Sequence, residues 1–304
     1  MSGRVVVVGG YNVDMTVVSA TLPMPGQTVL GREFHTGPGG KGSNQAIGAR
    51  RLGAAVTLVV KVGADAFGLA ARRLFESEGL SGPGILEDRT HTGVALVLVD
   101  DTGTNAISVA PGANARLTAQ DVIGLGGVFD GATHLLCQLE CGLDLFTEIA
   151  QHARRIGATT ILDPSPAVRL PPEVLGLVDV LTPNEAELRV LTDLPTTAAS
   201  EIERAARTLT GMGVEVVVVT LGERGAMRVT AGTSETFAPY AVRARDTTGS
   251  GDAFNAGLVT GLASGLPAAE AIRLGLRAGA FCATRLGVLE GLPTREQLDR
   301  EVPG

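Results

Sequence analysis

Short uninterrupted runs of apolar residues, many of them β-branched, constrain the fold of this chain more than any other feature. Such runs are typical of strands buried on both faces of a sheet, as in parallel α/β proteins. They recur at residues 5–8, 56–60, 134–138, 159–162, 178–181 and 214–220. Amphipathic helical patterns lie between several of them, the clearest at 67–78, where Gly79 follows as a stop. The alternation predicts a doubly wound, mostly parallel central sheet with helices on both faces.

Two stretches, at about residues 11–36 and 91–110, do not follow this rhythm. Apolar and polar residues alternate in them, and no helical pattern separates the strands. The segment "HTGVALVLVDDTGTNAISVA" predicts a hairpin that turns at residues 101–103. We therefore expect a small antiparallel sheet outside the main one, in the place of a lid. No linker or composition shift divides the chain, so residues 1–304 are predicted to form one domain.

The composition narrows the classes of partner and the compartment. The net charge is −7 and aromatic residues make up only 3%, which argues against nucleic acid but leaves room for a small anionic ligand. The apolar run near the start is too short for a signal peptide, and no stretch approaches the roughly 20 apolar residues of a membrane span. Three cysteines without a metal or redox spacing are interpreted as buried thiols in a reducing cytosol. We expect a cytoplasmic protein with no membrane partner.

The glycine-rich stretch "GPGGKGSNQ" at 37–45 resembles a phosphate loop but fails its pattern. A P-loop requires G-x-x-x-x-G-K-[ST], whereas Lys41 is followed by Gly42 and His35 stands at the first glycine position. The glycines allow close backbone approach, and Lys41 and Asn44 offer hydrogen-bond donors ahead of a predicted helix. This mixture favours a polyhydroxy ligand.

Carboxylates end the segments that follow two of the predicted strands. Asp14 ends "GGYNVD" after the first strand, and Glu140 ends "QLE" after the strand at 134–138. Open α/β sheets bind ligands at the carboxyl ends of their strands, and a carboxylate accepts hydrogen bonds from neighbouring hydroxyls. Each carboxylate taken alone is also compatible with an ordinary solvated loop residue.

The segment "RDTTGSGDAFNAG" at 245–257 offers a second ligand site. It fails the dinucleotide fingerprint because Phe254 stands at the third glycine position. Its loop of small residues leads into a helical pattern, which places backbone N–H groups and the helix dipole in position to bind an anion. Asp252 beside that loop suits a general base, although a first-turn helix acid would look the same in sequence. Glu187 in "TPNEAE" is similarly open between a water-mediated Mg²⁺ partner and a first-turn acid.

Taken in order and spacing, seven motifs resemble the ribokinase-like sugar kinases, the PfkB family, over nearly the whole chain. They are "GGYNVD", "PGGKGSNQA", "TGVALVLV", "GAN", "TPNEAE", "TLGERGA" and "DTTGSGDAF". The resemblance implies a helix-flanked central sheet with a β-lid that also joins two copies into a homodimer. It implies transfer of the γ-phosphoryl group of MgATP to a sugar, and "GGKGSNQA" with "GAN" points to the primary 5-hydroxyl of D-ribose.

The resemblance also implies a role for each matching residue. Asp252 would be the catalytic base, beside an anion hole at Gly249, Ser250 and Gly251. The sugar would be bound by Asn12, Asp14, Gly40, Lys41, Asn44, Glu140 and Asp252. The ATP phosphates and Mg²⁺ would be held by Asn184, Glu187, Thr220, Gly222 and Gly251. An activating K⁺ would be held mostly by backbone carbonyls of Asp246, Thr248, Cys282, Arg285, Gly287 and Gly291. Gly291 stands where a serine is common, which should weaken that cation site.

Three alternatives stay open at this point. The acceptor could be fructose, a sugar acid or a nucleoside, although 8 Phe and 2 Tyr offer little material for a base clamp. A non-catalytic sugar- or nucleotide-binding protein on the same fold would not need the intact Asp252 and glycine loop. A Rossmann dehydrogenase would need G-x-G-x-x-G after the first strand, which is absent.

Overall fold

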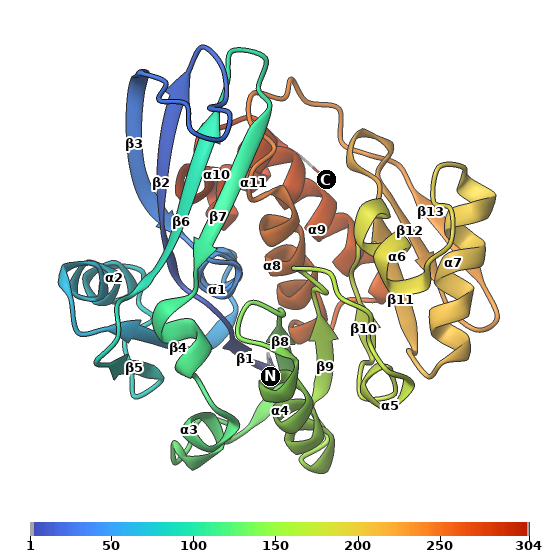
Figure 1. The fold of residues 1–304 in the computed structure, drawn as a ribbon. Helices are drawn as coiled ribbons and strands as arrows, with labels where there is room; N and C mark the ends of the chain where they lie inside the picture. Colours follow the sequence, from blue (N-terminus) through green and yellow to red (C-terminus); the bar gives the residue numbers. More distant parts are fainter. Residues whose placement is uncertain (1–2, 303) are drawn as a thin grey trace.

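A nine-stranded sheet forms the centre of the computed structural model, which describes residues 3–302 and 304 (Figure 1). Its strand order is β13-β12-β11-β10-β9-β8-β1-β4-β5. The strands are β1 (Arg4–Val8), β4 (Ala55–Gly63), β5 (Ile85–Asp88), β8 (Ala132–Cys137), β9 (Thr159–Leu162), β10 (Val180–Leu181), β11 (Val216–Thr220), β12 (Ala226–Val229) and β13 (Ser234–Phe237). Pairing is parallel from β11 to β5, and β12 and β13 add an antiparallel edge. The predicted parallel sheet is confirmed, although the run at 178–181 contributes only a two-residue strand.

A second, four-stranded sheet stands at one end of the first (Figure 1). It contains β2 (Asn12–Ser19), β3 (Gly31–Gly39), β6 (Gly93–Val99) and β7 (Asn105–Ala110), in the order β3-β2-β6-β7. β2 pairs with β3, and β6 with β7, in antiparallel fashion, and the two hairpins join through parallel pairing of β2 with β6. The predicted hairpin is confirmed, with its turn at Gly103. We call this sheet the lid.

Helices cover both faces of the central sheet, as predicted. They are α1 (Lys41–Arg51), α2 (Ala66–Ser77), α3 (Ala119–Gly124), α4 (Leu143–Arg155), α5 (Pro172–Leu175), α6 (Glu185–Thr192), α7 (Ala199–Gly211), α8 (Ser250–Ala263), α9 (Ala268–Ala283), α10 (Val288–Gly291) and α11 (Arg295–Glu301). Side chains of β1 alternate between two cores: Val5 and Val7 join one with α1, α8 and α9, and Val6 and Val8 join the other with α4, α6 and α7. No helix among residues 3–302 is long and apolar enough to cross a membrane.

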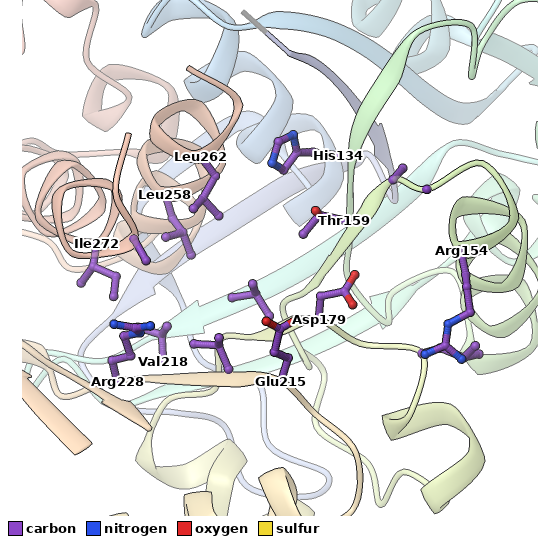
Figure 2. Close-up of a pocket in the computed structure, with 16 residues that line it drawn as sticks. His134, Arg154, Thr159, Asp179, Glu215, Val218, Arg228, Leu258, Leu262 and Ile272 are labelled. Atoms are coloured by element: carbon purple, nitrogen blue, oxygen red, sulfur yellow. The ribbon is translucent and has the colours of Figure 1, made fainter. Parts of the chain in front are cut away.

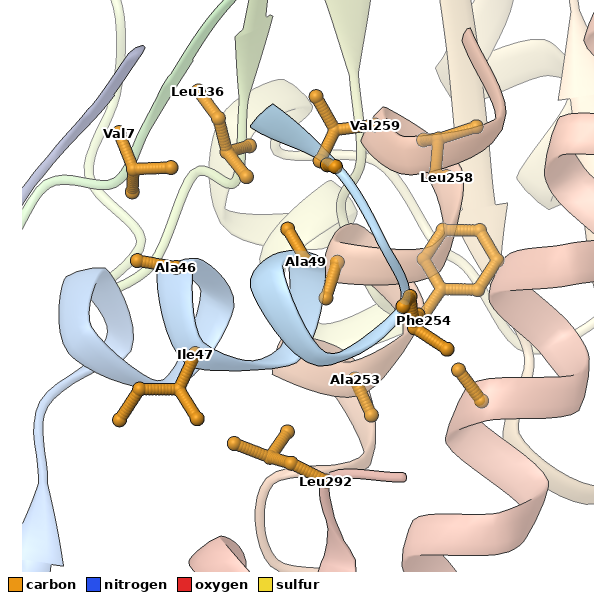
Figure 3. Close-up of a cluster of buried hydrophobic side chains, with 14 of the residues drawn as sticks. Val7, Ala46, Ile47, Ala49, Leu136, Ala253, Phe254, Leu258, Val259 and Leu292 are labelled. Carbon is orange, nitrogen blue, oxygen red and sulfur yellow. The ribbon is translucent and has the colours of Figure 1, made fainter. Parts of the chain in front are cut away.

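The packing of α1 against α8 positions the candidate site. Small side chains allow this close approach, since a Cβ added to Gly48 would lie 2.7 Å from the Cβ of Ala256. Ala46 and Ala49 of α1 and Phe254 of α8 lie in the same core cluster (Figure 3). The contact brings the first turns of the two helices together, although about 200 residues separate them in sequence.

Candidate active site

The glycines of the opening motif allow two backbone segments to cross. A Cβ added to Gly42 would lie 2.6 Å from the backbone of Gly9, and one added to Gly40 would lie 2.6 Å from the Cα of Tyr11. Gly40 also has a φ of 90°, which other residues rarely adopt. These glycines therefore seat the start of α1 against the end of β1, and no phosphate is needed to explain them.

Carboxylates surround the first residue of α1. The backbone N–H of Lys41 donates to Oε2 of Glu140 at 2.8 Å. Its ammonium group lies 3.4 Å from Oδ2 of Asp163 and 3.7 Å from Oδ1 of Asp252. Burial by itself would lower the pKa of Lys41, but the charges of Asp163, Asp252 and Glu140 outweigh it and raise that pKa. Lys41 is therefore a permanent cation in a mostly anionic pocket.

Two amides of α1 hold the carboxylate of Asp252. Asn44 donates from Nδ2 to Oδ2 of Asp252 at 2.9 Å, and Gln45 donates from Nε2 to Oδ1 at 3.0 Å. Asp252 lies in the first turn of α8 and is only 5% exposed. A carboxylate offers about four acceptor positions, so one oxygen lone pair can still face a ligand. The Asp252 carboxylate is thus held in place at the start of α8, where it can act as a proton acceptor.

The carboxylate predicted for the sugar, Asp14, lies on β2 of the lid at the rim of the same pocket. It packs so closely on the backbone of Gly39 that a side chain there would meet its carboxylate oxygens. Burial first, and then the negative charge of Asp252, raise the pKa of Asp14 to about 6. Nearby, Oδ1 of Asn12 accepts a hydrogen bond from Asn114 at 2.9 Å, which fixes its amide.

Two further carboxyl groups are destabilised as anions in this pocket. Burial and the charge of Asp252 raise the pKa of Glu140 to about 7, against the attraction of Lys41. Burial raises the pKa of Asp163 to about 6, with Lys41 opposing the shift. Burial and mutual repulsion thus store unfavourable energy that cationic or hydrogen-bond-donating groups of a ligand would relieve.

The glycine loop that was predicted to bind an anion lies at the start of α8. Gly249 is the N-cap residue, with a φ of 79° in the left-handed region. The N–H of Ser250 already donates to the carbonyl of Thr247 at 3.1 Å, so it is not free for an anion in this conformation. The N–H of Gly251 lies in the first helical turn, where acceptors within the helix are lacking. The loop therefore offers fewer free donors than the sequence suggested.

Asn184 and Glu187 form a reciprocal capping box at the start of α6. The N–H of Asn184 donates to Oε2 of Glu187 at 2.8 Å, and the N–H of Glu187 donates to Oδ1 of Asn184 at 2.9 Å. Asn184 also bridges to Thr220 at the end of β11, and Gly222 follows with a φ of 57°. The helix-acid interpretation of Glu187 is thus realised. This capping role does not exclude Mg²⁺ as a partner of Glu187. The negative charge of Glu187 acts on Lys41 and Asp163, and its Oε1 atom takes no part in the capping box.

The donor set fits a magnesium ion that arrives with a nucleotide. Among the described residues there is no group of three or more His, Cys, Asp or Glu side chains that could hold a metal. Mg²⁺ usually keeps several waters and binds one or two carboxylates together with substrate phosphates. Glu187 alone can supply that contact.

The two segments of the predicted monovalent-cation site lie together. Asp246 accepts hydrogen bonds from the N–H of Thr248 at 2.9 Å and from that of Gly287 at 3.1 Å. Burial opposes the charge of Asp246, but these hydrogen bonds outweigh it and lower its pKa. Arg285 is engaged elsewhere, since its guanidinium pairs with Glu301. The carbonyls of Thr248, Cys282 and Gly287 each already accept one hydrogen bond, and a carbonyl oxygen has a second lone pair that a cation such as K⁺ could use.

Cys282 changes the expected geometry around Gly291. Its thiol donates to the carbonyl of Thr248 at 3.4 Å. A Cβ added to Gly291 would lie 2.6 Å from the same sulfur and 3.3 Å from the Cys282 carbonyl oxygen. The thiol therefore fills the space that a side chain at position 291 would need.

Four polar residues of the site were missed by the sequence interpretation. Asp163 could have been found, because it directly follows β9, and Glu140 lies shortly after the end of β8 in the same manner. Gln45 and Asn114 lie in the quoted motifs "PGGKGSNQA" and "GAN", but only the folded chain shows that these two residues and Gln138 are at most 3% exposed and hydrogen-bonded.

The cavity in Figure 2 lies elsewhere, at the amino ends of β8 to β11. Its volume is about 510 Å³, and His134, Thr159, Asp179, Glu215 and Arg228 line it with apolar residues of α8 and α9. Ligands of open α/β sheets bind at the opposite, carboxyl ends of the strands. This cavity therefore does not belong to the candidate active site.

Comparisons with known proteins agree with the geometry. Residues 2–295 match the model of the "pfkB family carbohydrate kinase". A ribokinase of Haemophilus influenzae is 35% identical over 305 residues, covering 98% of this chain and 97% of that protein. A deoxyribokinase of Salmonella typhi is 30% identical, with 97% of each chain covered. The structure of Arabidopsis thaliana ribokinase complexed with ribose and ATP superposes with a TM-score of 0.90 at 29% identity, covering 99% of this chain and 98% of that one. The chain belongs to the pfkB family of carbohydrate kinases.

Proposed function

We propose that this protein transfers the γ-phosphoryl group of ATP to the primary 5-hydroxyl of D-ribose. The observation that carries the proposal is the buried Asp252 carboxylate, held by two amides of α1 at the glycine-rich start of α8. Such a carboxylate can accept the proton of an attacking hydroxyl while the helix terminus accommodates the transferred group. The similarity to ribokinases, one of them with a structure complexed with ribose and ATP, supports the substrates.

The sugar would lie between the lid and the start of α1. Asp14 and Glu140 offer acceptors to its hydroxyls, and Lys41 and Asn44 offer donors. Asp252 would remove the proton from the 5-hydroxyl as its oxygen attacks the γ-phosphorus and the bond to the β-phosphate oxygen breaks. The proton resides on Asp252 until product leaves. The N–H of Gly251 and the dipole of α8 stabilise charge on the transferring oxygens.

Two ions would support this step. Mg²⁺ would neutralise the charge of the ATP phosphates, with Glu187 as its protein contact through water. K⁺ would lie between the loops around Asp246 and Gly287 and offset the carboxylate charge near the glycine loop. The protein itself holds the loops around Asp246 and Gly287 in contact through the hydrogen bond from the N–H of Gly287 to Asp246.

The acceptor is the least constrained part of the proposal, because a deoxyribokinase is also similar. A panel of ribose, deoxyribose, fructose, sugar acids and nucleosides, assayed for ADP release, tests it directly. Ribose should give the highest kcat/KM, and a preference for another acceptor would replace it. Asp252→Asn should lower kcat by at least ~10²-fold while both substrates still bind. Near-normal turnover in that variant would remove Asp252 from the role of base.

We also propose that the lid joins two copies of the chain. Phe34 and Leu96 are exposed on one of its faces, and Ile107 and Val109 on the face that carries Asp14, each by more than half. Exposed apolar patches of this kind mark protein interfaces. Light scattering should give a dimer, and Phe34→Glu should dissociate it. Met212→Glu, at an exposed position outside the lid, should not; a monomeric parent protein would refute the proposal.

We place this enzyme in the cytoplasm. Cys137, Cys141 and Cys282 are all free thiols, as a reducing compartment favours, and ATP is the proposed phosphoryl donor. Cell fractionation with an antibody against the chain tests the location.

A further inference from the structure

One buried amide bridges two carboxylates of the site. Nε2 of Gln45 donates to Oδ1 of Asp252 at 3.0 Å and to Oδ2 of Asp163 at 2.7 Å. A side-chain amide has two N–H groups, so both are used. Gln45 is fully buried, and Asp163 and Asp252 are 3% and 5% exposed. Solvent therefore does not compete for these hydrogen bonds, and the position of each carboxylate depends on the amide.

The amide serves the site in only one of its two orientations. If it rotated by half a turn, Oε1 of Gln45 would face both carboxylates, and acceptor would oppose acceptor. A second amide discriminates between these orientations: Gln138 donates from Nε2 to Oε1 of Gln45. Gln138 follows β8 directly and is 3% exposed. Its own Oε1 has no hydrogen-bond partner among the described residues, so the hydrogen bond to Gln45 is the side-chain contact that Gln138 makes in this orientation.

The neighbouring backbone is built to admit this second amide. The Oε1 of Gln138 lies where a side chain on Gly9 would stand, so Gly9 is required for its placement. The segment after β8 is fixed on the other side, because the N–H of Leu139 donates to the carbonyl of Ser165 at 2.9 Å. Asp163 is fixed likewise, through its N–H to the carbonyl of Cys137 at 2.9 Å.

We propose that Gln138 and Gln45 form a directional amide relay that orients the Asp252 carboxylate toward the reacting hydroxyl. Both are positioning residues, because their side-chain contacts are with each other and with the two carboxylates. Asn44 holds the second oxygen of Asp252 and can lie within reach of the sugar, whereas Gln138 acts only through Gln45. The inference rests on the proposed function, in which Asp252 is the base.

The test is a double-mutant cycle on turnover. Gln138→Leu removes the donor to Gln45 without removing a contact of either carboxylate, and should lower kcat about 10-fold. Gln45→Met removes the bridge itself and should lower kcat about 10²-fold, the scale expected for a misplaced catalytic group. KM for sugar and for ATP should change less than about threefold in both variants, because neither amide is placed against substrate. In the Gln45→Met background, Gln138→Leu should change kcat by less than about twofold.

The outcomes separate this inference from the proposed function. If Asp252→Asn abolishes turnover but Gln138→Leu leaves kcat unchanged, the relay is refuted and the base assignment stands. If the two amide changes multiply independently in the cycle, Gln138 does not act through Gln45 and the relay is also refuted. If Asp252→Asn turns over normally, the proposed function fails first. Gln138 contacts neither Asp163 nor Asp252 directly, so Gln138→Leu keeps the test decisive even if Gln45→Met does not fold.

Discussion

The Cys282–Gly291 contact predicts that a serine can be restored at position 291 only if the thiol is removed. A Cβ at 291 would lie 2.6 Å from the sulfur, whereas heavy atoms in van der Waals contact lie about 3.5–4.0 Å apart. One of them must therefore move by about 1 Å in a packed interior, since Cys282 is 1% exposed. Overpacking of this size costs about 1–3 kcal/mol, and we expect Gly291→Ser to lower the free energy of unfolding by that amount.

Removal of the Cys282 sulfur should reverse the sign of the effect that Gly291→Ser has on the free energy of unfolding. Cys282→Ala alone loses one buried methylene-sized group and its weak hydrogen bond to Thr248, at a cost of about 1 kcal/mol. In Gly291→Ser/Cys282→Ala the new side chain occupies the vacated space, so the pair should be more stable than Gly291→Ser alone. Urea unfolding of the four proteins measures this coupling. Cys137→Ala, at an equally buried cysteine outside this contact, is the control and should add its effect independently. If the changes in unfolding free energy caused by Gly291→Ser and Cys282→Ala simply added in the double variant, the reasoning would be refuted.

Four further outcomes are expected. Asp14→Ala should weaken sugar binding by about 2–4 kcal/mol and leave ATP binding nearly unchanged, as calorimetry with each ligand would show; equal losses would indicate structural damage. The pKa of Asp14 is raised to about 6, so sugar affinity should fall as the pH drops from 7 to 5, where the carboxylate gains a proton and loses acceptor strength, and Asp14→Ala should flatten this dependence. Gly42→Ala should lower both stability and sugar affinity, because its Cβ would lie 2.6 Å from the backbone of Gly9 and only main-chain movement can relieve the contact; unchanged melting and binding would contradict the backbone crossing. Turnover at fixed ionic strength should be highest in K⁺, lower in Na⁺ and lowest in a bulky organic cation, and Gly291→Ser/Cys282→Ala should lower the K⁺ concentration for half-activation; equal rates in all three cations would show that no such site operates.

The central sheet was predictable from sequence because burial on both faces leaves a continuous apolar signal. The runs that became β1, β9 and β11 needed no other information. The short β10 was overestimated, since apolar residues before a strand look the same as residues within it. The join between the two lid hairpins was not foreseen, because parallel pairing of β2 with β6 depends on the path of the intervening chain.

The candidate site was predictable where a residue's position along a strand or helix carried the information. Glu140 and Asp252 follow a strand end and a glycine loop, and the structure places both at Lys41. Asp14 was expected at the end of the first strand but lies within β2 of the lid, close enough to Asp252 for that charge to raise its pKa. Gln45 differs, because an amide on a helix is ordinary until its neighbours across the fold are known. The contact between Cys282 and Gly291 likewise joins residues nine positions apart by packing that sequence does not display.

The meeting of α1 with α8 has a consequence for how the protein is made. Asn44 and Asp252 are hydrogen-bonded although 208 positions separate them, so the loop that must close before the site exists is most of the chain. Contacts of such long range form slowly and late. During synthesis, the amino-terminal half leaves the ribosome with Asp14 and Glu140 but without Asp163 and without the helix that carries the proposed base. A nascent or carboxy-terminally truncated chain should therefore be able to fold strands without being able to turn over substrate, and activity should appear only with the final helices.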